Sequence, residues 1–293
     1  MFKKILNPFF LTFLIICTIA ILPYLTPKKP LKVPSDNKLR EEAISHNLLP
    51  VPKEREKLLK LLSTPSNPLT KERVALGKEL FFDPRLSLDK SVTCASCHIL
   101  SEGGDDNLPT AIGYLGRANP QHLNSPTVLN AALQKYQFWD GRARSVEEQA
   151  GGPIQSSFEM NMKPKALVNR LKNDPAIVLM FDKAFGKNSL NFTNIRKAIG
   201  AYERTLLTRG PFDRFLDGNN SAISKAAKRG LTLFMERGCK GCHTGISIGG
   251  QFIKRFPLRS YLEDYLGINF HPKLSIKRDS IPFDNIGGFR GKT

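Results

Sequence analysis

The spacing of apolar residues along the chain predicts helices over much of its length. Thr193 and Ser221 each stand before a segment whose apolar residues recur every three or four positions, which is typical of a capped amphipathic helix. Ser145 and Glu148 have the spacing of a capping box at the start of a third helix. The apolar positions of the first two segments are Ile195, Ala198, Ile199, Tyr202 and Leu206, and Ile223, Ala226, Ala227, Leu231 and Phe234. Because alternating strand patterns with hairpin dipeptides are scarce, we expect an all-α fold.

The N-terminal 26 residues follow another pattern, with a basic start and an apolar run from residue 5 to residue 25. A run of about 20 apolar residues is close to the length that spans a bilayer and is longer than most cleaved signal cores. No A-x-A-like cleavage site follows it, so for residues 1–26 we favour an uncleaved signal anchor over a cleaved signal peptide. Residues 27–44 are rich in Pro and Lys at their start, which predicts a stiff, solvated linker.

Charge narrows the classes of partner only slightly. The chain of 293 residues has 44 Lys and Arg against 26 Asp and Glu, a net charge of +18. This surplus suits an acidic protein, an anionic membrane surface or nucleic acid, or it is a solvated lysine-rich surface. Since no zinc-finger, RNP or homeodomain pattern accompanies it, we exclude nucleic acid.

Four of the five cysteines fall into two C-x-x-C-H motifs. In such a motif both sulfurs bond to the vinyl groups of a haem, and the adjacent histidine binds the iron. The alternatives are a thioredoxin-like redox pair, which needs a βαβ setting that is absent from this pattern, and a Cys–His zinc site. We predict two haem c groups, with axial ligands His98 and His243. Their attachment residues are Cys94, Cys97 and His98, and Cys239, Cys242 and His243.

The segment from Thr208 to Asp213 lies between the two motifs and forms a natural boundary. We expect an N-terminal domain over residues 45–208 and a C-terminal domain over residues 209–293, each around its own haem.

Several further segments make a resemblance specific, over about residues 45–255. In chain order they are Leu76–Ser87, Asn124–Asn130, Phe138–Ala143, Glu148–Gln149, Gly152–Pro153, Phe158–Met160, Ala201–Thr205 and Pro211–Gly218. Together with the two haem motifs, this order resembles the bacterial di-haem cytochrome c peroxidase family, relatives of the methylamine-utilisation di-haem enzymes. The resemblance implies two cytochrome c-like domains with the haems near their interface.

The resemblance also implies roles for single residues. The haem on His98 matches the peroxidatic haem, and Glu159 matches the carboxylate that moves protons during peroxide cleavage. Gln149 matches a residue that helps hold the distal pocket. Trp139 matches the aromatic residue between the haems, although packing is the commoner role of a large aromatic side chain. Asn124 matches a position at a calcium site between the domains.

The sequence departs from the family at the residues that would supply the second axial ligand of each haem iron, opposite the motif histidine. Tyr114 stands where other members have a distal histidine on the peroxidatic haem, and His122 is the nearby alternative. If neither binds iron, we expect a five-coordinate haem that is active without prior reduction. No methionine follows Met235 to ligate the second haem, and the chain ends at Thr293 where the family continues. Either the sequence is truncated, or the ligand differs, the candidates being Tyr261, Tyr265 and His271.

We therefore expect an enzyme that reduces hydrogen peroxide with electrons from a small periplasmic cytochrome c or cupredoxin. The expected location is the periplasm, because haem is attached beyond the inner membrane, with residues 5–25 as the tether. The sequence leaves the oligomeric state undecided, and a homodimer is one alternative. The alternatives are a di-haem oxidase that modifies a partner protein, as in the methylamine-utilisation branch, and a non-catalytic electron-transfer cytochrome.

Overall fold

The computed structural model describes residues 31–119, 124–255 and 288–290, and within them the chain is helical apart from one short antiparallel strand pair. The strands are β1 (Ile253–Arg255) and β2 (Gly288–Arg290). The α-helices are α2 (Asp36–Ser45), α3 (Arg55–Leu62), α4 (Lys71–Phe81), α5 (Cys94–Cys97), α6 (Val146–Gln155), α7 (Pro164–Lys172), α8 (Pro175–Phe185), α9 (Phe192–Glu203), α10 (Pro211–Leu216) and α11 (Lys225–Glu236). Five 3₁₀ turns join them, at Pro84–Leu86, Leu100–Glu102, Tyr114–Gly116, Ala131–Leu133 and Cys239–Gly241.

The larger hydrophobic core lies among α4, α6, α7, α8 and α9. Helix α4 packs closely on α9, where a Cβ atom added at Gly77 would lie 1.9 Å from the carbonyl oxygen of Ala198. The predicted apolar face of α9 is confirmed, since Ile195, Ala198 and Ile199 are fully buried. This core supports one wall of the first haem motif, because Cys94 packs against it.

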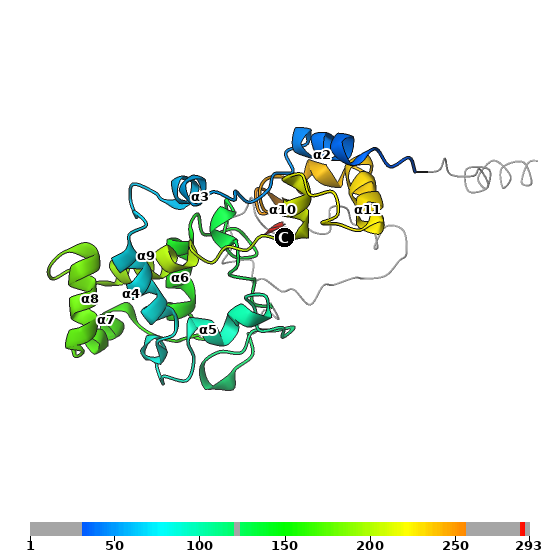
Figure 1. The fold of residues 1–293 in the computed structure, drawn as a ribbon. Coiled ribbons are helices and arrows are strands. Elements are labelled where there is room, and N and C mark those ends of the chain that lie inside the picture. The colour runs from blue at the N-terminus through cyan, green and yellow to red at the C-terminus, as the bar shows by residue number, and fades with distance from the viewer. Residues whose placement is uncertain (1–30, 120–123, 256–287, 291–293) are drawn as a thin grey trace, which may run out of the picture.

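The smaller core joins segments that are far apart in the sequence. Leu39 and Ala43 of α2 pack with Phe215 and Leu216 of α10 and with Met235 of α11. Figure 1 shows α2 beside α10 and α11, away from the helices of the larger core. The predicted linker range 27–44 therefore contains most of a helix that packs on the second half of the chain.

Two of the three predicted helix starts are displaced. Helix α6 does begin after Ser145, whose hydroxyl accepts a hydrogen bond from the Glu148 amide at 3.1 Å. Helix α9 is capped by Asn191 instead of Thr193, because the Asn191 side chain accepts from the Asn194 amide at 2.9 Å. Helix α11 is capped by Ser224, whereas Ser221 lies in the preceding turn and bonds Asn219. The prediction was wrong at these two caps because several neighbouring polar residues suit the position equally.

Among the described residues, no helix combines the length and the apolar composition needed to cross a bilayer. The predicted anchor over residues 5–25 lies outside that part of the chain.

Candidate functional site

The first Cys motif is held in one turn of helix by its own neighbours. Thr93 and Ser96 form a reciprocal cap, in which the Thr93 hydroxyl accepts from the Ser96 amide and the Ser96 hydroxyl accepts from the Thr93 amide. The His98 amide then donates to the carbonyl of Cys94 at 3.0 Å. This turn presents both thiols and the imidazole to the same cavity, as attachment of one haem requires.

The His98 ring is oriented by the main chain. Its Nδ1 lies 3.2 Å from the carbonyl oxygen of Gly104. Gly104 has φ +78, and a Cβ atom there would lie 2.7 Å from the Thr127 hydroxyl, so glycine suits this turn. Burial lowers the pKa of His98, which favours a neutral ring. A neutral ring that donates from Nδ1 leaves the Nε2 lone pair for a metal.

The second motif repeats this local geometry. The His243 amide donates to the Cys239 carbonyl at 3.0 Å, and His243 Nδ1 lies 3.2 Å from the carbonyl oxygen of Ile248. The Phe234 ring packs edge-on against the imidazole, at 5.9 Å between centroids. Both motif histidines thus have Nδ1 against a backbone carbonyl and Nε2 available for iron.

A contact that the sequence did not predict holds the second motif to the N-terminal segment. Lys240 Nζ lies 2.5 Å from Nε2 of His46, the residue that directly follows α2. The Gly245 amide donates to the carbonyl of Asn47 at 2.7 Å, and Leu48 forms a parallel bridge with Gly245. The end of α2 is therefore part of the frame around Cys239 and Cys242. The candidate sixth ligands Tyr261, Tyr265 and His271 lie outside the described residues.

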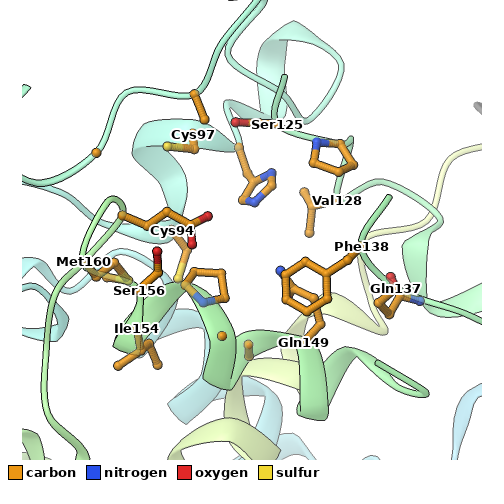
Figure 2. A pocket seen from close by; sticks show the side chains of 18 of the residues that line it. Cys94, Cys97, Ser125, Val128, Gln137, Phe138, Gln149, Ile154, Ser156 and Met160 are labelled. Carbon is orange, nitrogen blue, oxygen red and sulfur yellow. The ribbon is translucent and has the colours of Figure 1, made fainter. Parts of the chain in front are cut away.

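A cavity of about 440 Å³ opens beside the first motif. Its wall includes Cys94, Cys97 and His98 together with all three residues predicted to assist catalysis, namely Glu159, Gln149 and Trp139. Figure 2 shows Gln149 and Phe138 across this cavity from Cys97 and Ser125. Two thiols and an imidazole on the wall of a largely apolar cavity are the donor set that haem c needs.

Glu159 lies in the turn that follows α6. The Tyr114 amide donates to its carbonyl at 2.6 Å, and a Cβ atom at Gly113 would lie 2.1 Å from the carbonyl oxygen of Phe158. Burial raises the pKa of the Glu159 carboxyl, while a hydrogen bond with Ser156 and the charge of Arg142 oppose that change without reversing it. A carboxyl with a raised pKa in a cavity is suited to accept and return protons.

Trp139 is held by a hydrogen bond and lies in a tightly constrained turn. Its indole Nε1 donates to the carbonyl of Asn124 at 3.0 Å. The preceding Phe138 has φ +65, a conformation that a bulky side chain rarely adopts, and the Arg142 guanidinium lies 3.5 Å from the centre of its ring. Arg142 also pairs with the buried Asp140 at 2.9 Å. This turn holds the indole at the cavity wall.

Asn124, predicted at a calcium site, takes part in two hydrogen bonds. Its side-chain amide donates to the Leu108 carbonyl at 2.5 Å, and its own carbonyl accepts from Trp139. Within the described ranges, no group of three or more His, Cys, Asp or Glu side chains is arranged to hold a metal ion. The calcium site stays a prediction.

Tyr114 is absent from the side chains that line the cavity. Its ring instead lies 5.9 Å from the guanidinium of Arg117, which follows the same turn. The alternative ligand, His122, lies outside the described residues. Tyr114 is therefore not among the residues that border this cavity.

The sequence assigned no role to one further residue of the cavity wall, Glu203 at the end of α9. It belongs to the segment Ala201–Thr205, which is one of the segments that match the family, but the match gave no role to any residue in it. Its buried position depends on how α9 meets α5 and α6, which the local sequence pattern does not contain.

Comparison with known proteins places these observations in a family. A sequence model described as "Di-haem cytochrome c peroxidase" matches residues 71–221. The cytochrome c551 peroxidase of Pseudomonas aeruginosa is 46% identical over 187 residues, covering 63% of this chain and 54% of that protein. The methylamine utilization protein MauG of Methylorubrum extorquens is 46% identical over 182 residues, covering 61% of this chain and 51% of that protein. The chain spans about half the length of the curated relatives it matches.

Solved structures agree on the fold. A MauG-like protein associated with microbial copper homeostasis superposes with a TM-score of 0.62 at 23% identity, covering 78% of this chain and 71% of that chain. The dihaem peroxidase BthA from Burkholderia thailandensis gives a TM-score of 0.52 at 24% identity, covering 62% and 50%. At these identities the likeness concerns the fold alone.

Proposed function

The chain belongs to the di-haem cytochrome c peroxidase family, and from this premise we propose that it takes part in the reduction of hydrogen peroxide to water. The supporting observation is the shared cavity, which is lined by a haem-attachment motif, a carboxyl with a raised pKa and an indole. Reduction of one peroxide consumes two electrons and two protons and releases two waters. The site must therefore bind peroxide, move protons and pass electrons.

Each of these tasks has a candidate among the residues of this chain. Haem bound through Cys94, Cys97 and His98 would supply the iron that holds peroxide and the electrons that reduce it. Glu159 takes a proton from the near oxygen of peroxide and returns it to the departing oxygen. Gln149 helps hold the distal pocket, and Trp139 relays electrons from the second haem, on His243. The His98–Gly104 hydrogen bond fixes the ring so that Nε2 keeps its direction.

The position of Tyr114 supports a haem that is open to peroxide from the start. This side chain is not among those that line the cavity. If no other residue binds the iron, a haem held by His98 would have one protein ligand. We expect a five-coordinate, high-spin signal for it in the oxidised protein, by electron paramagnetic resonance and absorption spectroscopy. A six-coordinate, low-spin signal at this haem would show that another residue binds the iron.

The electron donor we propose is a small periplasmic cytochrome c or cupredoxin that acts at the second haem. The same proposal includes a periplasmic location, with residues 5–25 as the membrane tether. It also includes a calcium ion near Asn124, a homodimer, and two domains over residues 45–208 and 209–293.

The direct test is peroxide turnover by purified, fully haem-loaded protein with a reduced small cytochrome as donor. We expect donor oxidation that depends on peroxide and falls in Glu159→Gln. Protein that carries both haems and exchanges electrons with the donor, yet leaves peroxide unconsumed, would be an electron carrier. The 46% identity with MauG favours one second candidate, an oxidase acting on a partner protein. Tyrosine as the sixth ligand of the haem on His243 would favour that oxidase.

A further inference from the structure

The last residue of α9 is a buried carboxylic acid in the wall of the haem cavity. Glu203 is only 6% exposed, and it lines the cavity that also contains Cys94, His98 and Glu159. Glutamate is almost never fully buried unless a partner compensates its charge. The partners of this carboxyl therefore decide what it does.

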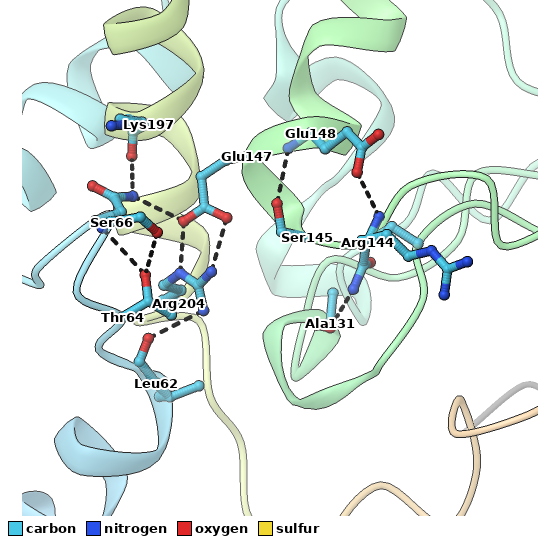
Figure 3. A network of polar contacts seen from close by, with 12 residues as sticks. Leu62, Thr64, Ser66, Ala131, Arg144, Ser145, Glu147, Glu148, Lys197 and Arg204 are labelled. Carbon is cyan, nitrogen blue, oxygen red and sulfur yellow. Dashed lines mark hydrogen bonds and ion pairs between the residues drawn. The ribbon is translucent and has the colours of Figure 1, made fainter.

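The adjacent arginine is already engaged. Arg204 donates from Nε and Nη2 to the two carboxylate oxygens of Glu147, each at 2.8 Å, and from Nη1 to the carbonyl of Leu62 at 3.1 Å. Figure 3 shows this arrangement, with Glu147 of α6 held between Arg204 and the segment before α4. In the part of the chain that the structure describes, no hydrogen bond or ion pair joins the Glu203 carboxyl to another residue, and the carboxyl borders the cavity.

The surroundings favour the neutral acid. Burial raises the pKa of Glu203 to about 8, the nearby carboxylate of Glu147 adds to the increase, and the charge of Arg204 opposes it. Leu80 and Phe81 of α4 belong to the larger hydrophobic core, against which Cys94 of α5 packs, and Cys94 shares the cavity wall with Glu203. Glu147 and Arg204 are therefore the charged groups that act on Glu203, and they are paired with each other.

We propose that Glu203 holds a proton beside the haem site, taking it up when the haem on His98 gains an electron and releasing it when that electron leaves. This rests on the proposed function, because it requires haem in the cavity. A ferric haem has one more positive charge than a ferrous haem, so reduction removes a charge that had favoured the carboxylate. One electron and one proton enter together, and the buried site keeps its net charge.

The test is the pH dependence of the reduction potential of this haem, measured by spectroscopic redox titration from about pH 5 to about pH 9. In the wild type we expect the potential to fall as pH rises, by at most about 59 mV for each tenfold drop in proton concentration. Glu203→Gln keeps the shape of the side chain and cannot titrate, so the slope above neutral pH should be lost. Glu203→Asp retains an acid and should retain a slope. The exposed Glu79→Gln, on α4, is the matched control and should leave the slope unchanged.

Infrared difference spectra between the reduced and oxidised protein supply a second measurement. The carbonyl band of a protonated carboxyl should appear on reduction in the wild type and in Glu159→Gln, and be absent in Glu203→Gln. If Glu203→Gln does not load haem, the band and its shift in heavy water in the wild type still report on a buried acid. A slope and a band that persist in Glu203→Gln would overturn the inference, as would a wild type with neither. Protein that binds no haem, or that loads haem without consuming peroxide, would instead refute the proposed function.

Discussion

Replacing Arg204 with methionine would remove the central cation of the network that joins α6 and α9. The Arg204 side chain is 8% exposed and that of Glu147 is 14% exposed, so the ion pair lies in the interior. Both oxygens of Glu147 accept from Arg204, and one also accepts from Asn67 Nδ2 at 2.8 Å. Methionine has a similar length and fills most of the same volume, so the change tests charge and hydrogen bonding more than packing.

The expected loss follows from what the substitution leaves behind. Removing one partner of a buried ion pair costs about 3–5 kcal/mol because the other charge stays buried without compensation. Asn67 still donates to Glu147, which moderates the loss, whereas the Leu62 carbonyl loses its donor, which adds to it. We expect Arg204→Met to lower the free energy of unfolding by about 3 kcal/mol.

Denaturant unfolding of the full chain, followed by circular dichroism, measures this loss. The double variant Glu147→Gln, Arg204→Met removes the uncompensated charge and should be more stable than Arg204→Met alone. The reasoning would be refuted if Arg204→Met unfolded within about 0.5 kcal/mol of the wild type, the ordinary range for a surface substitution. A double variant no more stable than Arg204→Met would also contradict it.

Three further predictions follow from the same geometry. Glu159→Gln should lower the rate of peroxide reduction by about 10²- to 10⁴-fold with haem content unchanged, measured by steady-state kinetics, and a loss below about threefold would contradict a proton-transfer role. Burial acts to raise the pKa of Glu147, but its bonds to Arg204 and Asn67 outweigh this and leave the pKa lowered. The ion pair therefore stabilises the fold above about pH 4.3, the ordinary pKa of glutamate, and this stabilisation should be lost as pH falls through the lowered pKa. In acid unfolding, Glu147→Gln should lose less stability with falling pH than the wild type. Gly77→Ala would place a Cβ atom 1.9 Å from a carbonyl oxygen of α9, so it should lower stability by about 1–3 kcal/mol or more, and an unchanged thermal midpoint would show that α4 and α9 are further apart.

Local patterns in the sequence predict a large part of the fold and of the candidate site. In each C-x-x-C-H motif the histidine amide bonds the carbonyl of the first cysteine, so the local geometry and the chemistry can be predicted from five consecutive residues. The apolar face of α9 and the cap at Ser145 are likewise properties of single segments. Glu159, Gln149 and Trp139 came from the resemblance, and the structure brings them to one cavity.

The remaining features depend on contacts between distant segments. Helix α2 packs on α10 and α11, and His46 contacts Lys240, across 194 positions of sequence. The Glu147–Arg204 pair spans 57 positions, and the burial of Glu203 depends on how α9 packs against the neighbouring helices. No periodicity within one segment specifies such pairings, which are set by how helices pack.

The central claim is that porphyrin is fixed to this chain at two places. Intact mass spectrometry of protein produced with haem-maturation machinery tests it most directly. We expect a mass increase of two haems in the wild type and of one haem when Cys94 and Cys97 are both replaced by alanine. Wild-type protein without added porphyrin, or with a haem content that does not change in that double variant, would contradict the claim.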